Sequence, residues 1–77
     1  MDIDMTDVTL HIDEALDTDQ LEHLESRLRA QEGVISVGRR PDRPHLMVVE
    51  YNPRRATGER ILSTVRSDGL HAELIGL

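Results

Sequence analysis

The stretch Val8-Thr9-Leu10-His11-Ile12 decides how the chain folds, because apolar and polar residues alternate along it. Successive residues of a β-strand point to opposite faces of the sheet. Val8, Leu10 and Ile12 are therefore expected to face a core, while Thr9 and His11 face the other way. The pattern predicts a half-buried strand with two chemically different faces.

An amphipathic helix is predicted after this strand. Asp17 or Thr18 can cap its start, and Gly33 is expected to end it. Leucines recur inside it with the i, i+3, i+7 spacing of a buried helical stripe. The polar residues on its other side are expected to face water: Glu22, Glu25, Arg29 and Gln31.

Four further elements complete the pattern. The β-branched residues 34–37 predict a second strand and residues 46–51 a third, while the prolines of residues 38–44 predict a loop between them. A second helix is predicted over residues 57–66. Alternation over residues 70–75 predicts a final strand.

The resulting βαββαβ order predicts an α+β fold, the ferredoxin-like sandwich, in which two helices cover one face of a four-stranded antiparallel sheet. The strand order 4-1-3-2 is a property of that fold. We expect a single domain over residues 1–77, with an ordered core from about residue 7 to 76 and flexible residues 1–6.

Composition excludes several kinds of protein. The chain has 77 residues and no cysteine, which rules out disulfides, thiolate zinc sites and thiol nucleophiles. Its formal charge of −6 and single aromatic residue, a tyrosine, argue against nucleic-acid binding. The sequence has neither an apolar run of membrane-spanning length nor a signal-peptide pattern at its start, so we expect a soluble, cytoplasmic protein that does not bind membranes.

Catalytic motifs are also missing from the sequence. It has no Ser-His-Asp signature, no phosphate-cradling glycine loop and no His-Glu-x-x-His motif. The loop after the first strand is acidic and would repel a phosphate group. We therefore expect that the chain is not an enzyme.

Charge is distributed unevenly along the chain. Residues 1–32 hold ten acids and two arginines, a balance of −8, whereas residues 33–77 hold five acids and seven arginines, a balance of +2. The expected topology brings the first loop and the hairpin after the second strand to one end of the molecule. Mutual neutralisation is expected there between Asp13, Glu14, Asp17 and Asp19 on one side and Arg39, Arg40 and Arg43 on the other.

A known family shares several features of this sequence: Glu32-Gly33-Val34, then Val48-Val49-Glu50-Tyr51-Asn52-Pro53, then Ile61, Val65, Gly69, Leu70 and Ala72. With them the chain resembles the heavy-metal-associated (HMA) domain over about residues 7–76. That family comprises copper chaperones and the N-terminal modules of metal-pumping ATPases. The resemblance implies the same ferredoxin-like fold.

The family's metal site has no counterpart in this sequence. Members carry a methionine and two cysteines, three apart, between the first strand and the first helix. The cysteine positions correspond to Asp17 and Gln20, and the methionine position to Ala15. Cu(I) prefers polarizable sulfur ligands, which carboxylate and amide oxygens do not replace. The chain is thus similar to a Cys-less variant of the family, and no cofactor is expected beyond weak divalent metal binding.

Two sets of non-cysteine ligands stay open for such a metal. The acidic loop, residues 13–20, offers oxygens to a hard cation, with Asp17 and Gln20 among them. His11 and His71 are expected on neighbouring strands and could hold zinc, nickel or Cu(II) together with Asp13 or Glu73.

The sheet face without helices is the most informative surface. Alternation places Leu46, Val48 and Ile75 there, together with Arg40, provided that Met47, Val49 and Tyr51 point inward. Apolar side chains clustered on one uncovered sheet are typical of a contact surface. We therefore expect a module that binds another protein, or another copy of itself, through this face; metal binding is the alternative function.

Overall fold

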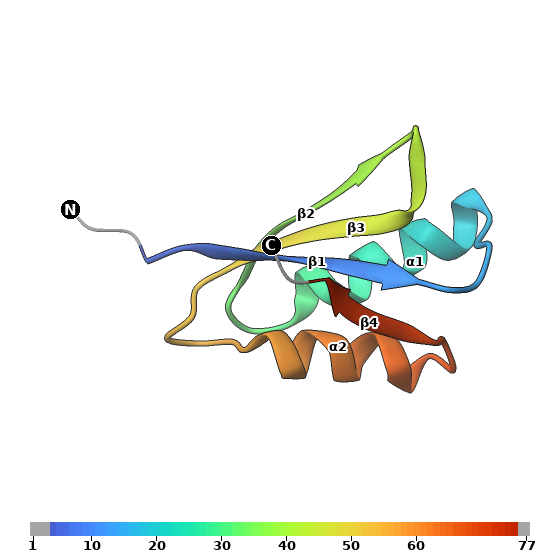
Figure 1. Cartoon of the computed structure of the whole chain (residues 1–77). Coiled ribbons are helices and arrows are strands. Elements are labelled where there is room, and N and C mark those ends of the chain that lie inside the picture. The colour runs from blue at the N-terminus through green and yellow to red at the C-terminus, as the bar shows by residue number, and fades with distance from the viewer. Residues whose placement is uncertain (1–3, 76–77) are drawn as a thin grey trace.

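Two helices cover one face of a four-stranded antiparallel sheet (Figure 1). The computed structural model describes residues 4–75. The strand order is β2-β3-β1-β4, which is the predicted order read from the other edge, so the ferredoxin-like fold is confirmed. The elements are β1 (Thr6–Ile12), α1 (Thr18–Ala30), β2 (Val34–Arg40), β3 (Arg43–Tyr51), α2 (Gly58–Ser67) and β4 (Ala72–Ile75).

The sequence predicts one domain with an ordered core from about residue 7 to residue 76. β1 begins at Thr6, one residue before the expected start of the core. Residues 1–3, which belong to the segment expected to be flexible, lie outside the described residues. Residue 76, the expected end of the core, lies outside them too. Within residues 4–75, no helix is both long and apolar enough to cross a membrane.

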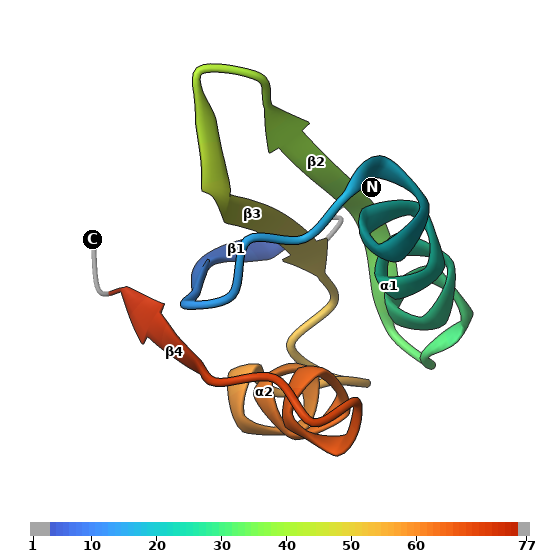
Figure 2. The ribbon, with the colours of Figure 1, turned by 90° about the vertical axis from the view of Figure 1, so that its right-hand side faces the viewer.

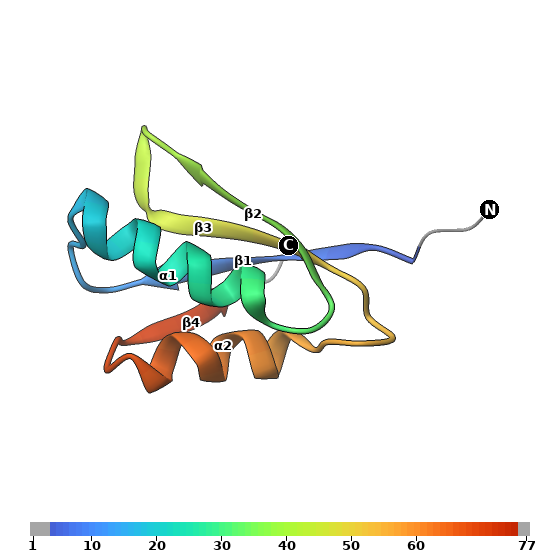
Figure 3. The ribbon, with the colours of Figure 1, turned by 180° about the vertical axis from the view of Figure 1, so that it is seen from behind.

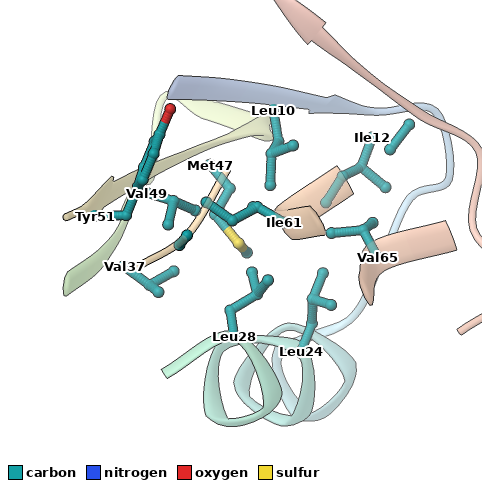
Figure 4. Packing of buried hydrophobic residues seen from close by; sticks show 12 residues of the cluster. Leu10, Ile12, Leu24, Leu28, Val37, Met47, Val49, Tyr51, Ile61 and Val65 are labelled. Carbon is teal, nitrogen blue, oxygen red and sulfur yellow. The ribbon is translucent and has the colours of Figure 1, made fainter. Parts of the chain in front are cut away.

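The core lies between the sheet and the helices, where the side chains of β1 and β3 meet those of α1 and α2 (Figure 4). Burial of these apolar side chains is the main favourable contribution to folding. On β3 the alternation is clear, since Met47, Val49 and Tyr51 are buried whereas Leu46 and Val48 are only half-buried. The other fully buried large side chains are Leu10, Leu24, Leu28, Ile61 and Val65.

Gly33 connects α1 to β2 in a conformation that other residues rarely adopt. Its φ is +89°, and a Cβ atom there would lie 2.8 Å from the Cβ of Ala56. Its carbonyl accepts a hydrogen bond from the backbone N–H of Asn52 at 2.8 Å. Both the left-handed backbone and the close approach therefore require glycine.

The turn or loop predicted over residues 38–44 is too long, because β2 continues to Arg40 and β3 begins at Arg43. Only Pro41 and Asp42 form the turn. Pro44 is tolerated because the β2–β3 register is irregular there: Arg40 pairs with Arg43, but Arg39 pairs with Met47. A proline in such an interruption removes no regular ladder hydrogen bond.

The prediction that Glu25 faces water is also wrong. Its exposed fraction is 6 %. One carboxylate oxygen lies 3.1 Å from Nε of Arg39, and the other lies 3.5 Å from Nη2 of Arg29. The longer hairpin explains the difference, since β2 carries Arg39 across the side of α1 instead of ending before it.

The expected neutralisation of the first loop by the hairpin does not occur within residues 4–75. Asp13, Asp17 and Asp19 form no ion pair with an arginine, and Glu14 pairs with a histidine. The hairpin tip bends away from the β1–α1 loop, although both lie at one end of the molecule (Figure 2). The other arginine pairs join Arg27 to Asp68, Arg54 to Asp4 and Arg55 to Glu32.

Candidate functional site

Asp17 and Gln20, which the sequence resemblance matches to the HMA cysteine pair, lie at the start of α1, where Asp17 is the N-cap residue. A carboxylate oxygen of Asp17 accepts a hydrogen bond from the backbone N–H of Gln20 at 2.8 Å. The side-chain oxygen of Gln20 accepts one from the backbone N–H of Asp17 at 2.9 Å. The two side chains thus form a reciprocal capping box, which satisfies N–H groups that a helix start leaves free.

Glu14 in the same loop holds His71, which precedes β4. The Glu14 carboxylate accepts hydrogen bonds from the His71 backbone N–H at 2.9 Å and from its ring Nδ1 at 2.7 Å. The hydrogen bond from the ring, followed by that from the backbone, lowers the pKa of Glu14 below its ordinary 4.5. The same side-chain hydrogen bond, reinforced by the negative charge of Glu14, raises the pKa of His71 above its ordinary 6.5.

The structure does not place His71 beside His11, as the metal hypothesis expected. His11 lies opposite Glu73 in the β1–β4 register. Its Nδ1 lies 3.2 Å from a carboxylate oxygen of Asp13, which is within ion-pair distance. The geometry does not make a hydrogen bond, however, so this buried nitrogen has no hydrogen-bond partner in the described part of the chain.

His45 is the neighbour of His11 that sequence reasoning missed. The two rings are stacked, with centroids 5.8 Å apart and an angle of 21° between the planes. His45 Nδ1 lies 2.7 Å from the carbonyl oxygen of Ile12 and donates to it. Its place in the irregular part of β3 leaves no periodic signal in the sequence. Among residues 4–75 there is no group of three or more histidines and acids placed to hold a metal ion.

The open sheet face has an apolar centre. Both helices lie against the opposite face, so no helix covers this one within residues 4–75 (Figure 3). Val48 of β3 lies opposite Gly38 on one side and Thr9 on the other, and Thr9 lies opposite Ile75 of β4. Leu46 adjoins this row. A groove of about 690 Å³ runs across this centre, and it is lined by the apolar Leu46, Val48 and Ile75 and also by the charged Asp7, Arg39, Arg40 and Arg43.

Charged residues of like sign face each other at both ends of this surface. Asp7 of β1 lies directly opposite Glu50 of β3, and Arg40 of β2 lies directly opposite Arg43 of β3. Glu50 accepts a hydrogen bond from the Ser36 hydroxyl. Within residues 4–75, none of the four charged side chains takes part in an ion pair. Like charges placed directly across two strands destabilise a sheet.

Comparisons with known proteins agree with this fold. No protein-family model matches the sequence, and no curated protein matches it. A solved structure described as a copper-binding domain from HMA7, a P-type ATPase, superposes with a TM-score of 0.81 at 16% sequence identity, covering 91% of this chain and 93% of that one. At this identity the likeness shows a shared fold, the fold that the sequence resemblance implied.

Proposed function

We propose that this chain is an HMA-like domain without a thiolate metal site, and that it acts as a protein-binding module through its open sheet face. The observation that carries the proposal is the uncovered apolar centre formed by Leu46, Val48 and Ile75, with charges at either end. Single exposed apolar residues are ordinary, but a contiguous cluster on one sheet is typical of interaction sites. The proposal assigns the chain no catalytic activity.

The start of α1 supports the same proposal. Asp17 and Gln20 each use a side-chain oxygen to satisfy the backbone of the other. A metal ion would have to compete with these hydrogen bonds, and soft cations gain little from oxygen ligands. The structural role of the two residues is sufficient to explain their presence there.

Affinity capture from an extract of the host cell tests this function, with a variant of the face and a matched control. Val48→Glu puts a charge in the apolar centre, and Ser63→Glu adds the same charge on the exposed side of α2. Circular dichroism shows whether both variants are folded. We expect Val48→Glu to lose the proteins that the wild-type chain and Ser63→Glu retain. The same retained proteins on all three chains, from a wild-type chain that also does not self-associate, would contradict the proposal.

Divalent metal binding is the second candidate function, and one observation favours it. Nδ1 of His11 lies 3.2 Å from the nearest carboxylate oxygen of Asp13, and no hydrogen bond joins the two atoms. Two ligand atoms of a tetrahedral zinc ion, each about 2.0–2.1 Å from the metal, lie at roughly that separation.

Zinc titration by calorimetry compares the wild-type chain with a variant in which His11 and His71 are both alanine. Loss of micromolar affinity in the variant would assign the site to the imidazoles, and retained affinity would assign it to the acidic loop, residues 13–20. No heat of binding in the wild-type chain would contradict a metal function.

A further inference from the structure

We infer that the open sheet face binds a second copy of this chain in a two-fold symmetric dimer. The inference rests on the proposed function, since it names the occupant of the same face. It is carried by the positions of the two like-charge pairs, the acidic pair Asp7–Glu50 and the basic pair Arg40–Arg43, at opposite ends of one apolar surface.

Each pair is unfavourable in the isolated chain. Directly opposed like charges on neighbouring strands repel each other. The hydroxyl of Ser36 donates a hydrogen bond to Glu50, but it brings no positive charge. Within the described residues, neither the acidic pair nor the basic pair is compensated by an ion pair. A neighbouring molecule with the opposite charge pattern would remove both penalties together.

The chain itself carries that pattern. When two copies pack face to face around a two-fold axis that crosses the strands near Leu46 and Val48, the strand direction is reversed between them. Arg43 of each copy then lies over Glu50 of the other, because both residues are on β3, and Arg40 and Asp7 flank this contact from the strands on either side. The apolar centres meet at the axis, and the same contact forms twice, as a two-fold interface requires.

The size of the face predicts a weak dimer. Four strands about 4.8 Å apart, with roughly six residues each at about 3.3 Å, cover about 400 Å² per copy. The total of roughly 800 Å² is below the ~1,600 Å² of a standard stable interface and is typical of transient complexes. Asp42 in the turn and Glu73 opposite His11 also reduce the positive charge at the basic end. We expect a dissociation constant in roughly the micromolar to millimolar range.

Charge reversal tests this arrangement by sedimentation equilibrium over a range of concentrations. Glu50→Arg and Arg43→Glu each turn a cross-chain attraction into a repulsion. Each variant alone should therefore associate at least about tenfold more weakly than the wild-type chain. Both variants should fold, because within one chain each turns a like-charge pair into an opposite-charge pair.

Mixing the two variants is the decisive step. In a mixed dimer the arginine introduced at position 50 of one chain would face the glutamate introduced at position 43 of the other. The unaltered Glu50 and Arg43 would also face each other, so both contacts are restored. We expect association of the mixture to recover to about the wild-type level, and raised salt to weaken the wild-type dimer. Ser63→Glu, on the helix side, should associate like the wild-type chain.

Three results would overturn the inference: a wild-type chain that stays monomeric at millimolar concentration, a dimer unaffected by both charge reversals, or a mixture that associates no better than its components. A monomeric chain whose Val48→Glu variant loses captured host proteins would overturn the two-fold dimer while leaving the proposed function in place. A monomeric chain with unchanged capture would overturn both.

Discussion

The loop end of the molecule, residues 13–20 with His71, differs from the open sheet face in the partners that its polar groups have. At the loop end, Asp17 and Gln20 each accept a hydrogen bond from the backbone N–H of the other, and Glu14 accepts two hydrogen bonds from His71. On the open face, like charges oppose each other at both ends and apolar side chains lie uncovered between them. Asp17, Gln20 and Glu14, at the loop end, thus have partners within the chain, whereas the charged pairs of the sheet face oppose each other without compensation within residues 4–75.

This difference indicates where binding energy is available. A side chain that already has an internal partner must lose it before it binds a ligand, so a new contact gains little. A repelled charge or an exposed apolar group gains on contact with a suitable partner. The open face is therefore the better candidate for an interaction site.

The largest effect is expected where the hairpin of the open face contacts the helices. Arg39→Met removes the closest partner of the buried Glu25, whose carboxylate lies 3.1 Å from Arg39. Breaking a buried pair leaves an uncompensated charge, so we expect a loss of about 1–3 kcal/mol in the free energy of unfolding. Arg40→Met is the control on the open face and should change stability by less than about 0.5 kcal/mol. Equal losses in urea unfolding would contradict the contrast between the two arginines.

At the loop end, Asp17→Ala removes the N-cap and with it the capping box. We expect a loss of about 1 kcal/mol in the free energy of unfolding. Asp19→Ala removes an acid from the first turn of the same helix without breaking the box, so only its interaction with the helix dipole is lost, about 0.3–1 kcal/mol. If denaturant unfolding shows no greater cost for Asp17→Ala, the loop end is not stabilised in the way described.

On the open face, a charge reversal should stabilise the monomer. Asp7→Arg places a positive charge opposite Glu50 and leaves the hydrogen bond from Ser36 to Glu50 in place, so the cross-strand attraction is expected to add about 0.2–1 kcal/mol. Thermal unfolding at low protein concentration, where the chain is monomeric, measures this change. A clear loss of stability would show that the Asp7–Glu50 pair is not repulsive in the folded chain.

The smallest effect concerns the Glu14–His71 contact, because both side chains are solvated. The raised pKa of His71 gives a contribution that is full below its unfolded value of 6.5 and is lost as the pH rises through the folded pKa. The lowered pKa of Glu14 gives one that is present above 4.5 and is lost as the pH falls through the folded pKa. The contact therefore stabilises most between these values.

His71→Gln tests this pH dependence. The melting temperature of the variant should fall further below that of the wild-type chain at about pH 5.5 than at about pH 8.5. A difference that is constant with pH would mean that ionisation of His71 does not contribute. Glu14→Gln should show the same trend, since it removes the other half of the contact.

Much of the fold could be predicted because each element carries its own pattern. The alternation in residues 8–12 and the leucine spacing of α1 need no knowledge of distant residues. Gly33 could be predicted as a helix end for the same reason. The extent of the hairpin strands could not, because Pro41 and Pro44 are typical loop residues, whereas here one forms the turn and the other occupies an irregular part of the register.

Features that depend on register or on element length could not be predicted. Burial of Glu25 follows from the length of β2, and the hydrogen bond from His45 to Ile12 from the irregularity of β3. The opposed pairs on the open face need the strand register, which composition does not give. The capping box did leave a signal in the sequence, an Asp and a Gln three residues apart. The prediction left Asp17 and Thr18 open as the cap and did not recognise Gln20 as the partner.

Association through the open face can be followed in the amide ¹H–¹⁵N NMR spectrum of the wild-type chain on dilution from about 1 mM to about 10 μM, a range that spans the expected dissociation constant. We predict that Thr9, Leu46 and Val48 on the open face shift with concentration, while residues 13–20 keep their positions. Shifts confined to residues 13–20, or a spectrum that does not change with concentration, would contradict the claim that the chain associates through its open sheet face.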